Sequence, residues 1–206
     1  MKLYDSQGPN PKKLRVYLAE KELTIPREFV DLTAGANRSC DFLAKNPMGR
    51  LPVLQLDDGS HLPESLAIME YLEELHPEPV MIGTNPLERA RVRALERVCE
   101  LGVLFRVSTI FLNVHPFATR GAMEGRLKQS PEAAAYARWY LESALAVLDV
   151  EMSGRSFVAG SHPTIADCTL FAALEFAEVA EIELPHVCPE VRRWYAEFRQ
   201  RSSASA

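Results

Sequence analysis

The spacing of apolar residues changes along this chain from short strands and helices to long helices alone. Short apolar runs at Lys2–Asp5 and Arg27–Asp31 predict two strands, and helical spacing between them predicts a helix over Pro11–Glu22. Asn10 before Pro11 is typical of a helix start, with Asn10 as the capping residue. Strand, helix and strand in this order predict a βαβ unit with a parallel strand pair.

A hairpin and a longer helix are predicted next. The expected elements are a short helix, a turn, two strands and a helix: Ser39–Lys45, Asn46–Gly49, Leu51–Leu56, Ser60–Leu62 and Glu64–Leu75. The sequence Asp-Asp-Gly at 57–59 favours a tight hairpin turn between the two strands. Prolines and a glycine within His76–Pro86 then interrupt the periodicity, which predicts a linker between two domains, 1–77 and 87–201.

Beyond the linker the apolar spacing is helical throughout. We expect helices over Leu87–His115, Pro131–Met152, Thr164–Ala180 and Pro189–Gln200, and a frayed tail over Ser202–Ala206. In the third of these helices, Thr164 stands at the cap position and Asp167 follows three residues later. Because this is the spacing of a capping box, we interpret the pair as structural and not catalytic.

Composition narrows the class of protein. Of the 206 residues, 47% are hydrophobic and 25% are charged, which is ordinary for a globular protein with a sizeable core. The net charge of −5 argues against general nucleic-acid binding, because phosphate recognition needs a basic surface. The apolar stretch Ile165–Ala180 holds three acidic residues, so we expect no membrane span there. Because Met1–Asp5 leads directly into a predicted strand, we expect no leader peptide.

The cysteines show neither a Cys-x-x-Cys pair nor the histidine spacing of a zinc site; they are Cys40, Cys99, Cys168 and Cys188. We therefore expect no metal, and reduced thiols in a cytoplasmic protein. A redox enzyme that uses its own thiols is disfavoured, because no cysteine stands near the start of the first predicted helix.

Several of these segments resemble the signature of the soluble, bacterial-type glutathione S-transferase family. The resemblance is carried by residues 46–54 (NPMGRLPVL), 57–59 (DDG), 64–72 (ESLAIMEYL), 164–167 (TIAD) and the opening 3–21. It implies a thioredoxin-like βαβ-α-ββα N-terminal domain followed by an all-helical C-terminal domain, usually as a homodimer. The order of elements predicted above is the same.

The resemblance implies that the N-terminal domain binds the tripeptide glutathione. Glu64 and Ser65 lie where helix N–H groups and the dipole attract the ligand's carboxylate, and Glu64 can accept from its ammonium group; both residues also simply favour a helix start. Leu51–Pro52 matches the family's X-Pro bond, normally cis, which would turn the Leu51 backbone toward the ligand; an ordinary trans proline is the alternative. Arg50 is either a contact for the glycine carboxylate or a solvated charge.

The residue that activates the thiol is harder to assign. Lowering the thiol pKa from about 8.5 by one or two units needs a hydrogen-bond donor or a helix N-terminus. Gly8 stands where many bacterial relatives have serine, and it offers no side-chain donor. The resemblance makes Asn10 the first candidate, with an electrostatic role because its amide can donate a hydrogen bond but cannot take the proton. Ser6 is the second candidate, and a site built from backbone alone stays open.

The pocket for the second substrate is expected between the domains. Its candidate lining residues are Phe105, Phe111 and His115, although aromatic residues at helical spacing more often belong to a core. Three arginines share one helix face and are expected to be solvated or paired with Glu96 and Glu100 in preference to meeting a partner subunit: Arg89, Arg93 and Arg97.

The sequence thus predicts a glutathione transferase that stabilises the thiolate of glutathione for attack on a hydrophobic electrophile, or for reduction of a peroxide or disulfide. One alternative is a non-catalytic protein of the same fold that acts in protein association or regulation, which Gly8 in the activating position favours. A dehalogenase or isomerase that uses glutathione as a cofactor is another.

Overall fold

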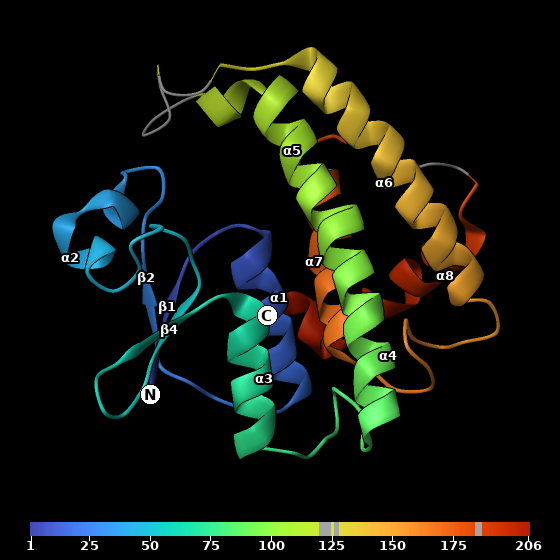
Figure 1. Ribbon diagram of the computed structural model, residues 1–206, viewed down its shortest axis with the longest axis horizontal. Coiled ribbons are helices and arrows are strands. Elements are labelled where there is room, and N and C mark those ends of the chain that lie inside the picture. The colour runs from blue at the N-terminus through green and yellow to red at the C-terminus, as the bar shows by residue number, and fades with distance from the viewer. Residues whose placement is uncertain (120–124, 126–127, 184–186) are drawn as a thin grey trace.

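A four-stranded sheet organises the N-terminal half of the computed structural model, which describes residues 1–119, 125, 128–183 and 187–206 (Figure 1). The strand order is β2-β1-β3-β4, formed by Arg27–Phe29, Lys2–Asp5, Val53–Gln55 and His61–Pro63. β1 and β2 are parallel, which confirms the predicted βαβ unit, whereas β3 pairs antiparallel with both β1 and β4. The predicted hairpin is therefore confirmed as well.

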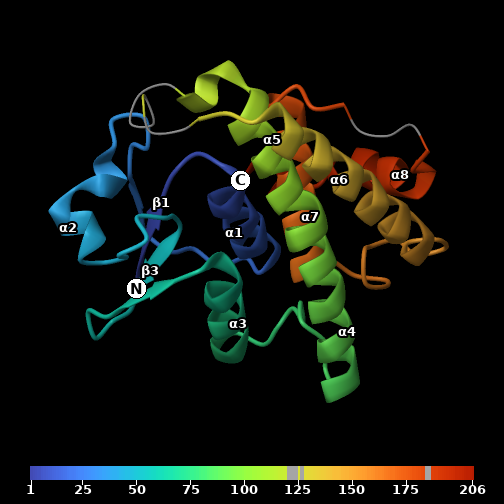
Figure 2. The same ribbon diagram turned by 45° about the horizontal axis from the view of Figure 1, so that its top comes forward.

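Side chains on the two faces of the sheet enter different hydrophobic clusters. Leu3 and Leu54 face the helices α1 (Pro9–Glu20) and α3 (Ser65–Leu75), which cover one side of the sheet (Figures 1 and 2). Tyr4 and Val53, their neighbours in the chain, join the smaller cluster with Phe42 of α2 (Cys40–Leu43) on the other side. This alternation follows from the two-residue period of a strand. A short 3₁₀ turn, η1 (Ala36–Arg38), leads into α2.

Residues 76–85 carry no helix or strand, and a buried carboxylate fastens them to the N-terminal half. Glu73 of α3 forms an ion pair with Lys21 Nζ at 2.6 Å and accepts hydrogen bonds from the Tyr17 hydroxyl (3.0 Å) and from the backbone N–H of Met81 (2.7 Å). Burial and this carboxylate raise the pKa of the Tyr17 hydroxyl above its ordinary value. The network holds α1, α3 and the connecting segment together.

The C-terminal half is helical. Its first long helix runs without interruption through α4 (Pro86–Arg97), the π-helical segment η2 (Val98–Leu104) and α5 (Phe105–Val114), and η3 (Pro116–Thr119) follows. The other elements are α6 (Pro131–Glu151), α7 (Ile165–Val179), α8 (Pro189–Phe198) and η5 (Ser202–Ser205). α7 lies between α1 and the long helix and is almost wholly buried (Figure 2). No helix among the described residues has both the length and the apolar character needed to cross a bilayer.

The start of α7 confirms the predicted capping box. Asp167 Oδ2 accepts from the backbone N–H of Thr164 at 2.8 Å and from its hydroxyl at 2.9 Å. Asp167 Oδ1 accepts from the indole Nε1 of Trp194 and from the N–H of Val158, each at 2.9 Å. Because all four donors converge on one carboxylate, the residue joins three segments of the C-terminal core.

The predicted fraying of Ser202–Ala206 is wrong. Arg201 makes two hydrogen bonds of 2.7 Å to the carboxylate of Glu20, and Lys12 Nζ donates to the carbonyl of Ala204 at 2.8 Å. The segment therefore lies along α1 as η5. Its partners are almost the whole chain away in sequence, so local composition could not reveal them.

Candidate active site

The first turn of α1 begins two residues earlier than predicted. Pro9 is its first residue, and the Gly8 carbonyl accepts from the N–H of Lys12 at 3.1 Å. Asn10 is therefore inside the helix, and the prediction that it caps the helix is wrong. Proline fits the first turn because its own N–H is not needed there, so Pro9 extends the helix to Gly8. Gly8 has φ 116°, a conformation that side-chain-bearing residues rarely adopt.

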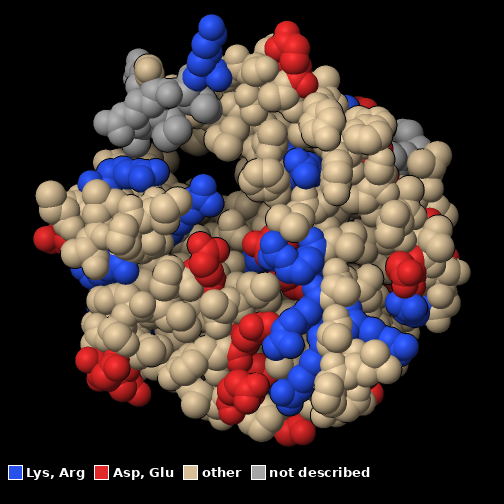
Figure 3. Space-filling view, in the orientation of Figure 1, with Lys and Arg blue, Asp and Glu red and all other residues tan. Residues whose placement is uncertain are grey.

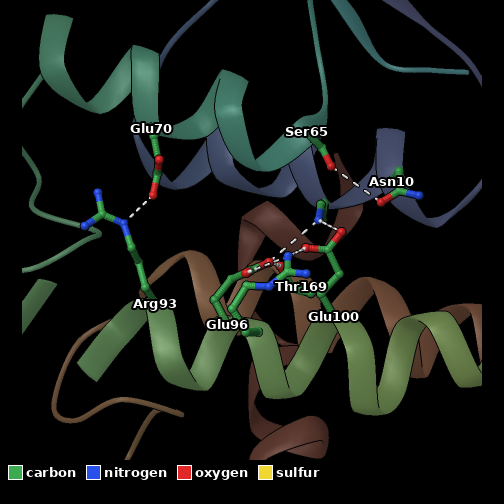
Figure 4. A network of polar contacts seen from close by, with 9 residues as sticks. Asn10, Ser65, Glu70, Arg93, Glu96, Glu100 and Thr169 are labelled. Atoms are coloured by element: carbon green, nitrogen blue, oxygen red, sulfur yellow. Dashed lines mark hydrogen bonds and ion pairs between the residues drawn. The ribbon is translucent and has the colours of Figure 1, made fainter. Parts of the chain in front are cut away.

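The starts of α1 and α3 meet. Ser65, the first residue of α3, is buried, and its hydroxyl donates a long hydrogen bond of 3.4 Å to Asn10 Oδ1 (Figure 4). Because Oδ1 receives this proton, the Asn10 amide group is left to donate elsewhere. Two helix N-termini with unpaired N–H groups thus face the same small region, where a negatively charged group is favoured.

Glu64 precedes α3 in an unusual backbone conformation. Its φ of 71° and ψ of 112° are rare for a residue with a side chain, and such conformations cost on the order of 1–3 kcal/mol. The side chain is exposed and makes no capping hydrogen bond to the helix. A strained residue with an unengaged carboxylate at a helix start is a candidate ligand contact, and backbone strain has no signature in the sequence.

The backbone just before β3 is unpaired. The Leu51–Pro52 bond is cis, as the resemblance implies. Neither the N–H nor the C=O of Leu51 has a hydrogen-bond partner among the described residues. Asn46 shapes the turn before it, because its amide donates to the Arg50 carbonyl at 2.8 Å. The Arg50 side chain is exposed, and no described residue pairs with it.

Ser6 lies near this region with its proton already used. Its hydroxyl is buried and donates to the Val30 carbonyl at 2.7 Å, joining the ends of β1 and β2. Asp5 Oδ1 accepts from the Ser6 N–H at 2.9 Å, and the same carboxylate pairs with Arg15. Without a rotation of its hydroxyl, Ser6 has no donor to offer a thiol.

The three predicted lining residues of the second-substrate pocket do not come together. Phe111 and His115 stack at 4.8 Å between ring centroids, and Phe111 also packs against Phe176 of α7. Phe105 is 54% exposed and instead contacts the guanidinium of Arg106. Figure 3 shows a hollow in the molecular surface. Lysine and arginine side chains of the N-terminal half lie on one side of it, and the C-terminal helices lie on the other.

Arg97 pairs with Glu100 as expected, whereas Arg89 and Arg93 pair with acidic residues of α3 and not with Glu96 or Glu100. Arg93 binds Glu70, Arg97 binds Glu100 at 2.7 Å, and Arg89 lies 3.6 Å from Glu74. Two of these pairs join α4 to α3. Among the described residues, no cluster of histidine, cysteine and acidic side chains has the arrangement of a metal site.

Family profiles match both halves of the chain. Residues 8–75 match the profile described as glutathione S-transferase, N-terminal domain, and residues 133–197 match glutathione S-transferase, C-terminal domain. Glutathione S-transferase 2 of Saccharomyces cerevisiae is 34% identical over 98% of this chain and 87% of its own. Maleylacetoacetate isomerase of Pseudomonas aeruginosa is 31% identical over 94% of this chain and 88% of its own.

Solved structures that are similar to this chain point to the same family. A glutathione S-transferase domain-containing protein of Marinobacter aquaeolei is 34% identical with a TM-score of 0.91, covering 98% of this chain and 99% of that one. Gtt2 of Saccharomyces cerevisiae is 33% identical with the same TM-score, covering 100% and 99%. A glutathione S-transferase of Methylobacillus flagellatus, solved with glutathione bound, is 25% identical with a TM-score of 0.83, covering 99% and 96%. The chain therefore belongs to the glutathione S-transferase family and is a glutathione-dependent enzyme with that family's fold.

Proposed function

We propose that glutathione lies at the N-terminal end of β3 with its amino-acid head at the start of α3. The observation that carries this proposal is the contact between Ser65 and Asn10, which brings two helix N-termini together, while the backbone of Leu51 before β3 is unpaired. Glutathione is a short peptide with an acidic head and a thiol, so it needs both unpaired backbone groups and an anion site.

Each candidate residue has a task in this arrangement. The Ser65 hydroxyl and the first N–H groups of α3 bind the head carboxylate, and Glu64 accepts from the head ammonium group. The Leu51 backbone pairs with the central cysteine of the ligand, while Arg50 binds the glycine carboxylate. Glu64 and Arg50 are exposed and the Leu51 backbone is unpaired, whereas the Ser65 hydroxyl would exchange its long hydrogen bond to Asn10 for one to the ligand carboxylate.

Asn10 is the proposed donor to the thiolate. Its amide nitrogen has no partner among the described residues, in contrast to the committed hydroxyl of Ser6. The thiol proton leaves to solvent, because an amide cannot accept it. The thiolate then forms a carbon–sulfur bond with a hydrophobic electrophile, and the leaving group departs with its bonding electrons. Removal of such electrophiles, that is detoxification, is the role that we propose.

Isothermal titration with glutathione tests binding, and conjugation of chlorodinitrobenzene together with a peroxide assay tests turnover. We expect binding at millimolar or lower concentration and activity in at least one assay. No binding at millimolar glutathione would refute the proposal. Binding without turnover in either assay would favour the non-catalytic alternative, which draws no support from the relatives described above.

A homodimer is the proposed assembly. Exposed apolar residues recur along α6 at helical spacing and continue onto the neighbouring long helix; this α6 aromatic face consists of Tyr136, Trp139, Tyr140, Val147 and Phe105. Arg106 lies 4.2 Å from the ring of Tyr140 and joins the two helices there. A contiguous apolar face of this kind is typical of a protein–protein interface, and a second copy of the chain would bury it.

Light scattering after size-exclusion chromatography tests the dimer. The wild type should show the mass of two chains and Trp139→Glu the mass of one. Val179 is 70% exposed on α7 and does not belong to the α6 aromatic face, so Val179→Glu is the matched control and should stay dimeric. A wild-type protein with the mass of one chain at micromolar concentration contradicts the proposal.

A cytoplasmic location is proposed from the cysteines. All four are free thiols, and three of them are buried. Reduced, unpaired cysteines suit a reducing compartment. Fractionation of the native cells followed by immunodetection tests the location, and recovery with an oxidising, extracytoplasmic fraction would contradict it.

A further inference from the structure

Charged side chains are buried between the two halves of the molecule, on the side of α1 that faces the long helix (Figure 4). We call these side chains, together with the threonine hydroxyl that bonds to one of them, the interdomain charge cluster. Its members are Lys13, Glu96, Glu100 and Thr169. The Lys13 side chain is fully buried, and Nζ lies 3.4 Å from Glu100 Oε1 and 3.7 Å from Glu96 Oε1. Lys13 follows Asn10 by three residues on α1, so the two residues lie on the same side of the helix about one turn apart.

The interdomain charge cluster is incompletely paired. Lys13 Nζ and Glu96 Oε2 are buried without a hydrogen-bond partner among the described residues. Glu96 Oε1 accepts from the Thr169 hydroxyl of α7 at 3.1 Å. Buried charges without full hydrogen bonding contribute little to stability, and apolar residues in their place are often neutral or better. What the cluster does supply is a positive charge held at a fixed place.

The charges around Glu96 determine how strongly this positive charge is offset. Lys13 faces it from α1, Arg97 and Glu100 from the long helix, and Cys99 and Asp167 are the neighbouring titratable groups in the core. Burial raises the pKa of Glu96 to about 7, although Lys13 acts in the opposite direction. Arg97 neutralises Glu100 through a hydrogen bond of 2.7 Å. Burial therefore favours the neutral form of Glu96, and to that extent Glu96 offsets less of the Lys13 charge.

We propose that Lys13 is a positioning residue for the reaction, whose buried ammonium group favours the thiolate of bound glutathione, while Glu96 limits that effect. This inference rests on the proposed function, because it requires the sulfur to lie at the start of α1. At roughly 10 Å and an effective dielectric constant of about 20–40, one charge shifts a pKa by on the order of one unit.

The two members of the pair predict shifts of opposite sign, which a merely structural role does not. Lys13→Met should raise the pKa of the bound thiol by roughly half to one unit, because the favourable charge is gone. Glu96→Gln should lower it by roughly half as much, because less of the lysine charge is offset. The double variant Lys13→Met/Glu96→Gln removes both charges, so its thiol pKa should lie between those of the single variants, raised above the wild type by roughly a quarter to half a unit.

The measurement is the ultraviolet absorbance of the thiolate of bound glutathione against pH, at saturating ligand, which needs no turnover. Glu70→Gln is the matched control: it breaks another ion pair between the same two halves, with Arg93, but at the surface, and should leave the thiol pKa unchanged. Circular dichroism and chemical denaturation establish that each variant is folded. If Lys13→Met does not fold, Glu96→Gln and the double variant decide the question.

Shifts in the same direction for both single variants, or no shift in either, would overturn the inference and leave the proposed function intact. Titration of the wild type with glutathione comes first. If the wild type does not bind glutathione, the proposed function fails, and this inference fails with it.

Discussion

The starts of α7 and α3 carry the same two chemical groups and use them differently. At α7, Thr164 and Asp167 are buried, and the carboxylate accepts from four donors of the chain. At α3, Glu64 is exposed in a strained conformation without a capping bond, and Ser65 makes one long hydrogen bond. We call the start of α7 closed, because side chains of the protein satisfy its polar groups, and the start of α3 open, because its polar groups are available to a ligand.

This difference shows why an acid and a hydroxyl at a helix start do not by themselves indicate function. A helix N-terminus has unpaired N–H groups that either side chains or a ligand can satisfy. Where the chain satisfies them, the residues serve stability. Where the chain leaves them open and strains the backbone, the residues are available for an external anion. Substitutions at the two sites should therefore separate stability from binding.

The largest expected effect is on stability, at the closed start. Asp167→Ala leaves four donors unpaired, among them the Trp194 indole, and should lower the free energy of unfolding by about 3 kcal/mol or more. Urea denaturation measures the loss. Asp167→Asn keeps part of the acceptor and should cost less. A loss below about 1 kcal/mol in Asp167→Ala would show that this carboxylate is not the structural centre described above.

At the open start, Ser65→Ala should weaken glutathione binding about tenfold, which corresponds to one lost hydrogen bond to a charged group. Its stability should change by less than about 1 kcal/mol, because the bond that it loses is long. Ser130, which caps α6 and makes no hydrogen bond to Ser65 or Asn10, provides the control: Ser130→Ala should lose stability and keep its affinity. Titration calorimetry measures the glutathione affinity of both variants, and urea denaturation measures their stability. Equal affinity in Ser65→Ala and the wild type contradicts the ligand role.

Asn10→Ala should raise the pKa of the bound thiol by roughly one unit, because the donor to the thiolate is removed. The pH dependence of kcat/KM reports the shift. The control is Asn85, whose side chain caps α4 through the N–H groups of Leu87 and Glu88. Asn85→Ala should cost about 1 kcal/mol of stability and leave the pH profile unchanged. An unchanged profile in Asn10→Ala would move the role to Ser6 or to the backbone.

The smallest effect is expected from Glu64→Gly. Glycine relieves the positive φ and should raise the free energy of unfolding by up to about 1 kcal/mol, while glutathione affinity falls. Glu22 also has a positive φ, at 54°, and its side chain is exposed after α1. Glu22→Gly should gain stability without any change in affinity. If Glu64→Gly keeps full affinity, the strain at that position has no part in binding.

Most of the fold follows from local patterns in the sequence. Apolar spacing predicted the order of strands and helices, and the Thr164 and Asp167 spacing predicted the capping box, because each depends on neighbouring residues alone. The two errors had different causes. Pro9 permits an earlier helix start than Pro11, and the tail Ser202–Ala206 is held by contacts with α1.

The site was accessible to sequence reasoning only through the resemblance. Glu64 and Ser65 gave a signal at a helix start, but the strain at Glu64 and the contact from Ser65 to Asn10 depend on tertiary structure. The pairing of Lys13 with Glu96 joins residues 83 positions apart, as their numbers show, and has no local signature. Pairs of buried charged residues that are distant in sequence therefore cannot be predicted from the sequence and are found only in the three-dimensional structure.

The most direct test of the open helix start is a crystal structure of the protein with glutathione. The account predicts that the head carboxylate of the ligand contacts Ser65 Oγ and the first N–H groups of α3, with the sulfur beside the first turn of α1. Clear density for glutathione elsewhere on the protein, or a start of α3 that saturating ligand leaves empty, would contradict it.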